Sequence, residues 1–473
     1  MVHSKLINNI QSLDAYQETV KTLCAKSNAD MPFNYLELPF IWWKNFSSSE
    51  DSDFGIRRGR NFWGRKSWVK DFKLLLTFEE KSVIGITPFT EIHATMSGRS
   101  NTVKMLTFTG DSVLIAYQDF LVDTSKRSEA LSSAFSTLKT VTESDFDILF
   151  LGYIPESSLN LPILNELLQQ TLKENWRGGV VKNQRRGGIY PWTFGRIIYH
   201  LSNLEKKMQE ENVDSHSLSS LLKKFSSVNT GFLHFKQTRV NLEKELNNCL
   251  KTIPAVDKYF QSVSEIRKLV NHENISYPEI KLPGDRDTYL SSLSKETRRY
   301  FRRYGKRFEE AGGRFEKIVS ADITDNDIHD FLNLHAERWK NESAAVSDKT
   351  INFHNELIRQ LSKHGNYTLF FATYQGRRIA SHACLDYAFR REAYFNGRDP
   401  AYEELRAGRL LYFETILDAI GKKFKVYDCG YGGDDYKLSF ANKLNNTSNV
   451  VLIPAGKSID LNSLFPNFEY IGL

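Results

Sequence analysis

The order of strand-like and helix-like segments limits the fold of this chain most strongly, because the same order occurs in its first and last thirds. In the first third, β-rich or alternating runs precede a helix pattern at residues 128–141, a buried-strand pattern at 147–154 and a second helix at 161–172. In the last third, strand-like runs again precede a helix, at 410–422, and a strand at 425–430. We therefore expect an α/β protein with mixed sheets, built from two copies of one unit.

The individual strands are expected at 72–78, 83–94, 103–110 and 117–123 in the first copy, and at 367–374, 378–389, 392–397 and 449–455 in the second.

The middle of the chain differs from both copies. Residues 176–276 hold 16 Lys and Arg against 9 Asp and Glu, a net charge of +7. Since the whole chain has a net charge of +6, the rest of it is close to neutral. Helical patterns are expected there at 201–211, 217–225, 239–253 and 263–270. We expect a first domain at 1–175, a basic helical insertion at 176–276 and a second domain at 277–473. The insertion is interpreted either as a solvated helical hairpin or as a specific binding arm.

Composition excludes several classes of protein. A chain of 473 residues with 41% hydrophobic residues is long enough for two or three folded domains. Its four cysteines, Cys24, Cys249, Cys384 and Cys429, show no metal-ligand spacing, and the first residues, MVHSKLINNI, contain no apolar signal core. We expect a reduced, cytoplasmic protein without a metal ion. No window is apolar enough to span a membrane, so only peripheral membrane contact stays open.

The segment YEELRAGRLLYFETILDAIGK, at residues 402–422, places a glycine between two arginines where a helix begins. Unpaired N–H groups at a helix N-terminus attract anions, and glycine lets the backbone approach them closely. A phosphate-binding loop is therefore predicted, formed by Arg406, Ala407, Gly408, Arg409 and Leu410. The alternative is that Gly408 only relieves crowding at the helix start. The corresponding segment of the first copy, DTSKRSEAL, contains no glycine, so only the second is suited to an anion.

This loop resembles the pyrophosphate-binding loop of GNAT-type acyltransferases. The whole chain resembles the CelD/BcsL-like acetyltransferases of polysaccharide synthesis, which have tandem GNAT-like folds. The matching stretches are PFIWWKNF, GITPF, KETRRYFRRYGKRFEEAGG, FNGRDPAYEELRAGRLL and YDCGYGGDDYKLSFA. The chain departs from the family by Arg-Ala in place of Ser-Pro before Gly408, and by Asp434 in place of glutamate.

The resemblance implies an acyl-CoA-dependent N- or O-acyltransferase, with acetyl-CoA as co-substrate. The implied acceptor is a sugar, a polysaccharide precursor, a phosphorylated envelope precursor or another cell-envelope metabolite. Acyl transfer to it is direct and uses a carboxylate base. It also implies that the second copy binds acyl-CoA, that the first is non-catalytic, and that the main chains of Tyr394, Phe395 and Asn396 hold the pantetheine arm.

Side chains near this loop supply candidates for proton transfer. Asp434 and Asp435 follow two glycines, and two adjacent carboxylates raise one pKa of the pair, although an aspartate there also suits an N-cap. Tyr436 either protonates the leaving thiolate or packs, and Lys437 either orients an anionic substrate or faces solvent. His382 is an alternative base or a structural histidine of a strand.

Two further groups are candidates for substrate binding. His335 and Arg338 lie one helical turn apart and line either a substrate cleft or a solvated helix face. Residues 295–314 hold eight Lys or Arg and three Glu, and the helical spacing of Arg298, Arg299, Arg302 and Arg303 creates a cationic face. A phosphorylated substrate is favoured over an anionic membrane, nucleic acid is the least favoured partner, and a solvated basic helix is the alternative.

Two competing functions stay open. Fem-like aminoacyltransferases, which use aminoacyl-tRNA, also end in a Tyr-Asp-x-Gly strand followed by a Tyr-Lys or Phe-Lys helix, and residues 176–276 would then bind tRNA. The other is a non-catalytic scaffold of a polysaccharide synthase. The sequence alone does not identify the acceptor, the acyl chain length or the oligomeric state.

Overall fold

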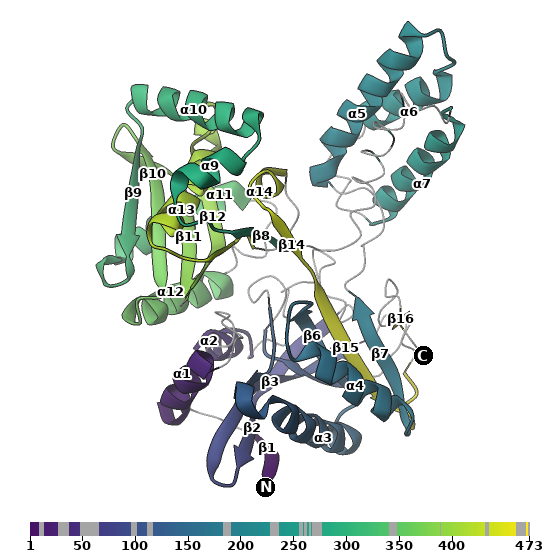
Figure 1. Cartoon of the computed structure of the whole chain (residues 1–473), viewed down its shortest axis with the longest axis vertical. Coiled ribbons are helices and arrows are strands. Elements are labelled where there is room, and N and C mark those ends of the chain that lie inside the picture. Colours follow the sequence, from purple (N-terminus) through teal and green to yellow (C-terminus); the bar gives the residue numbers. More distant parts are fainter. Residues whose placement is uncertain are drawn as a thin grey trace.

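Two mixed sheets and a separate helical unit make up the protein (Figure 1). The computed structural model describes residues 1–8, 14–26, 37–47, 66–95, 102–110, 117–182, 191–227, 236–254, 259, 263, 266, 277–339, 348–387, 389–430, 435–459 and 470–471. The mixed α/β architecture expected from the sequence is confirmed.

The first sheet has nine strands among the described residues, and their order along the sheet is β1-β2-β3-β4-β6-β15-β7-β16, with β5 paired to β3. The pairing of β4 with β6 is parallel, and the other pairings are antiparallel. The strands are β1 (Val2–Asn8), β2 (Lys66–Glu79), β3 (Ser82–Thr95), β4 (Thr102–Phe108), β5 (Leu121–Val122), β6 (Ile148–Pro155), β7 (Trp176–Lys182), β15 (Thr447–Pro454) and β16 (Tyr470–Ile471).

The second sheet has seven strands in the order β9-β10-β11-β12-β13-β8-β14. Its one parallel pairing joins β12 to β13, as the parallel pairing of the first sheet joins β4 to β6. Apart from β5 and β16, which have no counterpart in the second sheet, the strands of the two sheets follow the same layout, and this confirms the repeated unit. The strands are β8 (Tyr277–Lys281), β9 (Arg314–Val319), β10 (Tyr367–Tyr374), β11 (Arg377–Tyr387), β12 (Arg390–Arg398), β13 (Val426–Asp428) and β14 (Lys443–Asn445).

The two units exchange one strand each. β15 comes from the end of the chain, yet it lies between β6 and β7 of the first sheet. β8 precedes every other strand of the second sheet and occupies the equivalent place there, between β13 and β14. The first sheet therefore extends beyond residue 175 through β7, and it takes β15 and β16 from the segment expected in the second domain. Figure 1 shows β15 crossing from one unit to the other.

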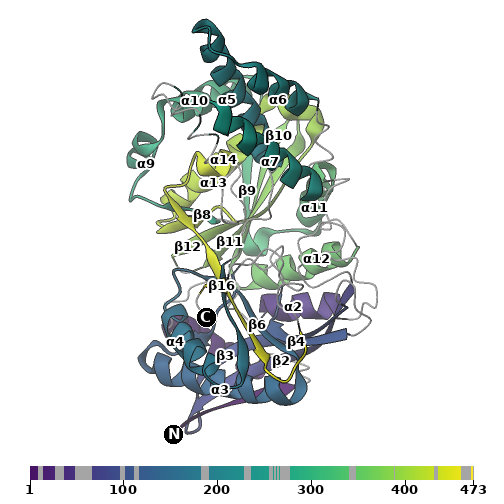
Figure 2. The ribbon, with the colours of Figure 1, turned by 90° about the vertical axis from the view of Figure 1, so that its right-hand side faces the viewer.

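Helices cover both sheets. α3 (Arg127–Asp145) and α4 (Leu161–Leu172) pack in one apolar core of the first sheet, while α1 (Gln17–Lys26) and α2 (Glu37–Phe46) lie in others. α9 (Arg286–Ser292), α10 (Lys295–Glu310) and α13 (Ala407–Gly421) pack on one face of the second sheet. α11 (Asp325–Trp339) and α12 (Asp348–Lys363) cover its other face together with α2, so this core joins the two units. Figure 2 shows α2 beside α12.

The helical unit contains α5 (Pro191–Glu210), α6 (His216–Ser226) and α7 (Lys236–Thr252). Its buried residues come from within the range 197–266, so it has a core of its own. The expected helix at 263–270 lies outside the described residues except for Val263 and Ile266.

Two expectations about strands differ from the structure. Of the strand expected at 117–123, only Leu121–Val122 forms β5, because Asp119 turns inward to accept hydrogen bonds from Ser158 and Asn160. Residues 176–182, placed in the helical insertion by their charge, form β7 through their pairing with β15. In the part of the chain that the structure describes, no helix is both long and apolar enough to cross a bilayer.

Candidate functional site

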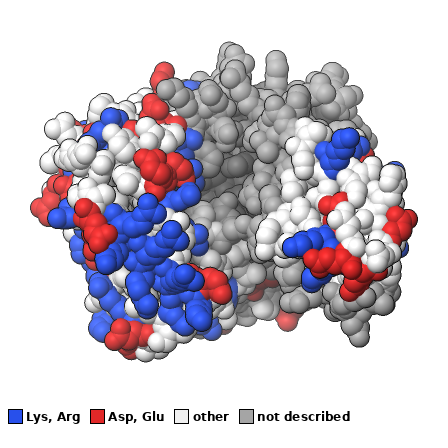
Figure 3. All heavy atoms as spheres, turned by 90° about the horizontal axis from the view of Figure 1, so that it is seen from above, with Lys and Arg blue, Asp and Glu red and all other residues white. Residues whose placement is uncertain are grey.

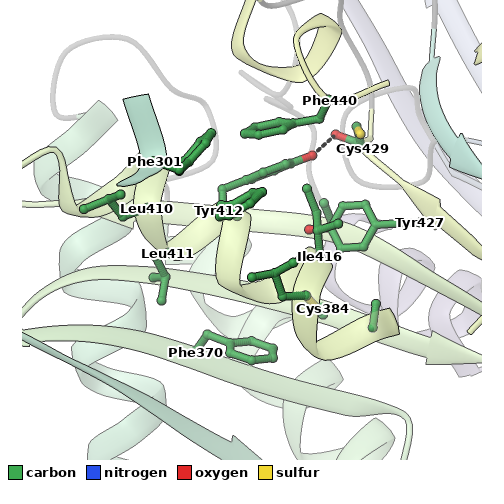
Figure 4. Close-up of a cluster of buried hydrophobic side chains, with 14 of the residues drawn as sticks. Phe301, Phe370, Cys384, Leu410, Leu411, Tyr412, Ile416, Tyr427, Cys429 and Phe440 are labelled. Carbon is green, nitrogen blue, oxygen red and sulfur yellow. Dashed lines mark hydrogen bonds between the residues drawn. The ribbon is translucent and has the colours of Figure 1, made fainter. Parts of the chain in front are cut away.

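The predicted anion-binding loop lies at the N-terminus of α13. Ten of its residues are buried, since this helix packs on β10, β11 and β12 beneath α9 and α10. Figure 4 shows Tyr412, Ile416 and Leu410 of α13 among Phe301, Phe370 and Phe440. This packing fixes the position of the N-terminus of the helix relative to the second sheet.

The first turn of α13 has amides that find no acceptor in the part of the chain that the structure describes. Arg406 adopts a left-handed conformation with φ 54° and ψ 21°, and its carbonyl accepts from the amides of Arg409 and Leu410 at 3.2 and 3.1 Å. Among the described residues, no acceptor contacts the amides of Ala407 and Gly408. Unpaired amides at the start of a 15-residue helix favour an anion.

Neither backbone conformation nor protein contacts require glycine at position 408. Gly408 does not have a positive φ, and a Cβ built there meets only the Arg398 side chain, at 3.6 and 4.0 Å, among the described atoms within 4 Å. An alanine would therefore fit. Glycine at this position leaves the space beside these amides open to close approach.

Three arginines surround this helix start. Arg398 and Arg406 both contact Glu403, at 2.8 and 3.4 Å. Arg409 lies over the ring of Tyr300, 4.3 Å from its centroid, and donates to Ser439 Oγ. The side chain of Arg409 thus joins α13 to α10, whereas Arg406 and Arg398 are partly exposed beside the free amides.

Strand β12 separates from β13 next to this helix start. The described residues of the two strands pair only at Arg390, Arg391 and Glu392, so no described strand lies beside the rest of β12 on that side. The register with β11 shifts between Ala383 and Cys384, which leaves Tyr394 as an extra residue, a β-bulge. A gap of this kind between two parallel strands exposes main-chain hydrogen-bonding groups to an extended ligand.

The side chains of Tyr394 and Phe395 pack toward the core that joins the two units, where both contact the ring of His354. The carbonyl of Asn396 hydrogen-bonds to His335 Nδ1 at 2.8 Å, and its side-chain oxygen accepts from Arg338. His335 and Arg338, both on α11, thus contact β12, the strand of the predicted pantetheine-binding residues.

Of the predicted catalytic residues, Asp434 lies outside the described residues and the side chain of Asp435 is not described. Tyr436 follows in α14 (Asp435–Leu438), and its ring meets that of Tyr412 edge-on at 5.2 Å. Lys437 is 8% exposed, so of its two alternatives the solvent-facing one is wrong, and its role in substrate binding stays a prediction.

His382 does not fit the role of base. It is buried on β11 between Tyr412, 5.0 Å away centroid to centroid, and the hydroxyl of Tyr427 at 3.5 Å. Burial lowers the pKa of His382 to about 3, with Arg338 and Arg391 adding to the shift. The histidine therefore stays neutral and poorly basic near neutral pH.

A buried pair of carboxyl groups was missed in the sequence analysis. Glu392 and Asp428 face each other where β12 and β13 part, and they are 2% and 0% exposed. Burial, and then the charge of Asp428, raise the pKa of Glu392 well above its ordinary value. No described group hydrogen-bonds to Glu392 Oε2. The charged residues within the strand-like run RREAYFNG are the sequence feature that could have indicated this pair.

The cationic helix α10 begins at the N-cap Ser294, whose hydroxyl accepts from the amide of Thr297. Arg298, predicted to bind substrate, instead donates to the carbonyls of Ser291 and Leu293 at the end of α9, at 2.9 and 2.6 Å. The other three predicted arginines, Arg299, Arg302 and Arg303, are exposed. None of them lies within ion-pair distance of a described carboxylate, and Figure 3 shows a continuous blue area of Lys and Arg on this side of the molecule.

The family model described as "Acetyltransferase (GNAT) domain" matches residues 295–438, from the start of α10 to the end of α14. This match places the protein among the acyltransferases. No curated protein matches the chain. The narrower resemblance to the CelD/BcsL-like family stays a prediction.

Several solved structures are similar to the chain at low identity. A conserved protein of unknown function from Bacteroides thetaiotaomicron VPI-5482 has a TM-score of 0.45 at 8% identity, over 95% of this chain and 100% of that one. L-PGS from Bacillus licheniformis has a TM-score of 0.44 at 8% identity, over 95% of each chain. A tandem GNAT protein from the clavulanic acid biosynthesis pathway has a TM-score of 0.39 at 9% identity, over 97% of this chain and 100% of that one.

Proposed function

We propose that the second unit transfers an acyl group, with acetyl-CoA as the donor, to an amine or hydroxyl acceptor. The observation that carries the proposal is the start of α13, where the amides of Ala407 and Gly408 have no acceptor among the described residues. A diphosphate accepts hydrogen bonds from such amides and is attracted by the helix dipole and by Arg406. The glycine at 408 leaves room for it.

The separated part of β12 is proposed to bind the pantetheine arm. Main-chain groups of Tyr394, Phe395 and Asn396 lie where β12 no longer pairs with β13. An extended amide chain adds hydrogen bonds to such an edge as a further strand would. This position would bring the thioester to the point where the two strands part, beside Glu392.

Acyl transfer requires a base for the acceptor and an acid for the thiolate. In the proposed step, the acceptor oxygen or nitrogen attacks the thioester carbonyl and its proton moves to a carboxylate. The C–S bond then breaks, and the thiolate takes a proton, for which Tyr436 is the candidate. Glu392 is our candidate for the base because its raised pKa suits proton removal near neutral pH. Asp434 and Asp435 keep the same role as predictions from the sequence.

The acceptor is proposed to be a sugar, a polysaccharide precursor or another phosphorylated envelope metabolite. The exposed arginines of α10 would bind its anionic group, with His335, Arg338 and Lys437 as further contacts. His335 and Lys437 are only 3% and 8% exposed, so both would contact the acceptor inside the protein.

Thermal unfolding with acetyl-CoA tests the donor site. Saturating acetyl-CoA should raise Tm of the wild type, since ligand at 100 times Kd adds about 2.7 kcal/mol to stability. Gly408→Ala should fold as well as the wild type, because the added Cβ meets only ordinary contacts and alanine favours the helix by about 0.5–1 kcal/mol. It should nevertheless lose the response to acetyl-CoA, as should Gly408→Asp.

The matched control is Gly421→Ala, at the other end of α13. A Cβ there meets no described atom within 4 Å, so the helix gains the same stabilisation without a change at the phosphate loop. Gly421→Ala should keep the full response to acetyl-CoA. An unchanged response in Gly408→Ala would refute the donor site. Activity with aminoacyl-tRNA and none with acyl-CoA would instead favour the Fem-like reaction, and no response to either would favour a scaffold.

A further inference from the structure

A row of charged side chains crosses the second sheet on the face turned toward the first unit. Direct pairing aligns Glu392 of β12 with Asp428 of β13, and Asp428 with Glu279 of β8. Arg390 donates to Asp428 Oδ2 at 2.9 Å and to Glu279 Oε2 at 3.3 Å. Since alternate residues of a strand share a face, Arg390 and Glu392 lie opposite Arg391, which points to α13.

The first unit also supplies a donor to this row. Tyr117, only 3% exposed, donates from its hydroxyl to Asp428 Oδ2 at 2.7 Å. Its ring lies 4.3 Å from the ring of Tyr277, centroid to centroid, on β8. Asp428 thus accepts hydrogen bonds from Arg390, Tyr117 and the amide of Gly430.

The repeated fold offers an internal comparison for this row. The strand pair of the first unit that corresponds to β12 and β13 is β4 and β6, where Met105 faces Ile148, Leu106 faces Leu149 and Thr107 faces Phe150. No carboxyl group lies in these pairs. The first unit therefore lacks the carboxyl pair of the second, yet it contributes a hydroxyl to that pair.

We propose that Tyr117 is a positioning residue of the acyl-transfer site, and that the first unit completes this site by holding Asp428 beside Glu392. The inference rests on the proposed function of Glu392 as base. With three donors, Asp428 is held beside Glu392, and its charge increases the affinity of the Glu392 carboxylate for the proton of the acceptor. The first unit is then a working part of the site without binding acyl-CoA itself.

The electrostatic environment supports this arrangement. Burial raises the pKa of Asp428, while Arg390, Tyr117 and the Gly430 amide lower it and Glu279 raises it. The groups that face Asp428 are Arg390 and Glu392 from β12, Glu279 and Tyr277 from β8, and Tyr117 from the first unit; Lys443 of β14 contacts Glu279 at 3.3 Å. Removing the Tyr117 hydroxyl therefore favours protonation of Asp428. Glu392 then stays deprotonated down to a lower pH than in the wild type.

The pH dependence of stability tests the link without any acceptor. The Tyr117 bond lowers the pKa of Asp428, so its stabilisation is present where Asp428 is charged and is lost as pH falls through the titration of Asp428. The difference in Tm between wild type and Tyr117→Phe should be largest at about pH 8 and shrink toward about pH 4. The control is Tyr367→Phe, on β10 of the same sheet, whose buried hydroxyl has no described partner.

Tyr367→Phe should shift Tm equally at every pH, and a Tyr117→Phe difference that also stays constant would overturn the proposal. In an acyl-transfer assay, Tyr117→Phe should move the acid limb of kcat/KM to lower pH by about one unit, with acetyl-CoA binding unchanged. An unmoved limb would also overturn it. Failure of the proposed function is seen separately, because wild type would then show no acyl transfer while the stability comparison still reports on Tyr117.

Discussion

Glu392 shows at the residue scale how a buried side chain can be chemically important without a motif. It occupies the last paired position before β12 and β13 separate, and burial beside Asp428 raises its pKa. A carboxyl group in a fully buried position normally has a partner for each oxygen, and Oε2 of Glu392 has none among the described residues. Glu392 Oε2 is therefore suited to accept a proton from the substrate.

Glu392→Gln should reduce acyl transfer by about 10²–10⁴-fold while keeping the Tm response to acetyl-CoA, because the amide keeps the shape and cannot accept the proton. The assay is release of free CoA with a panel of amine and sugar acceptors. Asp434→Asn and Asp435→Asn are the comparison variants. Full activity of Glu392→Gln together with loss in either aspartate variant would move the base to the turn before α14.

At the scale of elements, α10 combines an apolar and a cationic side. Phe301 and Phe308 are buried against the core, and Tyr300 stacks under Arg409 of α13, so the helix is held firmly next to the proposed phosphate-binding loop. Its exposed arginines therefore project a positive potential beside the proposed donor site. Such a field strengthens the binding of phosphates and weakens as salt rises.

Replacing Arg299, Arg302 and Arg303 together by Gln should weaken binding of acetyl-CoA or of a phosphorylated acceptor and make it less dependent on salt. Stability should change by less than about 0.5 kcal/mol per exposed site, as no described carboxylate pairs with these side chains. The control replaces Lys207, Lys223 and Lys244 of the helical unit, which are also exposed. Equal affinities of the two triple variants, measured by titration calorimetry, would contradict a role for α10.

For the whole molecule, the exchange of β8 and β15 ties the two units into one cooperative structure. β15 follows the second unit directly in sequence and inserts into the first sheet, where Leu452 is fully buried. The core that contains α2 and α12 adds a second connection. The described residues of the helical unit form a separate core and exchange no strand with either sheet.

Leu452→Ala should cost about 2–5 kcal/mol and lower the temperature at which acetyl-CoA binding is lost, although Leu452 lies in the first sheet. Leu246→Ala removes an equally buried leucine from the helical unit and should leave that temperature unchanged. Calorimetry with and without acetyl-CoA measures both. If Leu452→Ala left the acetyl-CoA-binding unit melting as in the wild type, the two units would be independent.

Local patterns in the sequence determined most helices and strands, their repeated order and the prediction of a loop around the glycine at the start of α13. They could do so because helix periodicity, strand alternation and backbone freedom depend on neighbouring residues. The tertiary structure alone decided the exchange of β8 and β15, the burial of Lys437 and the pairing of Glu392 with Asp428. Tyr117 and Asp428 are 311 positions apart, and no local pattern reports that two such distant side chains meet. Their contact exists because two folded sheets bury a shared core, and its chemistry follows from that burial.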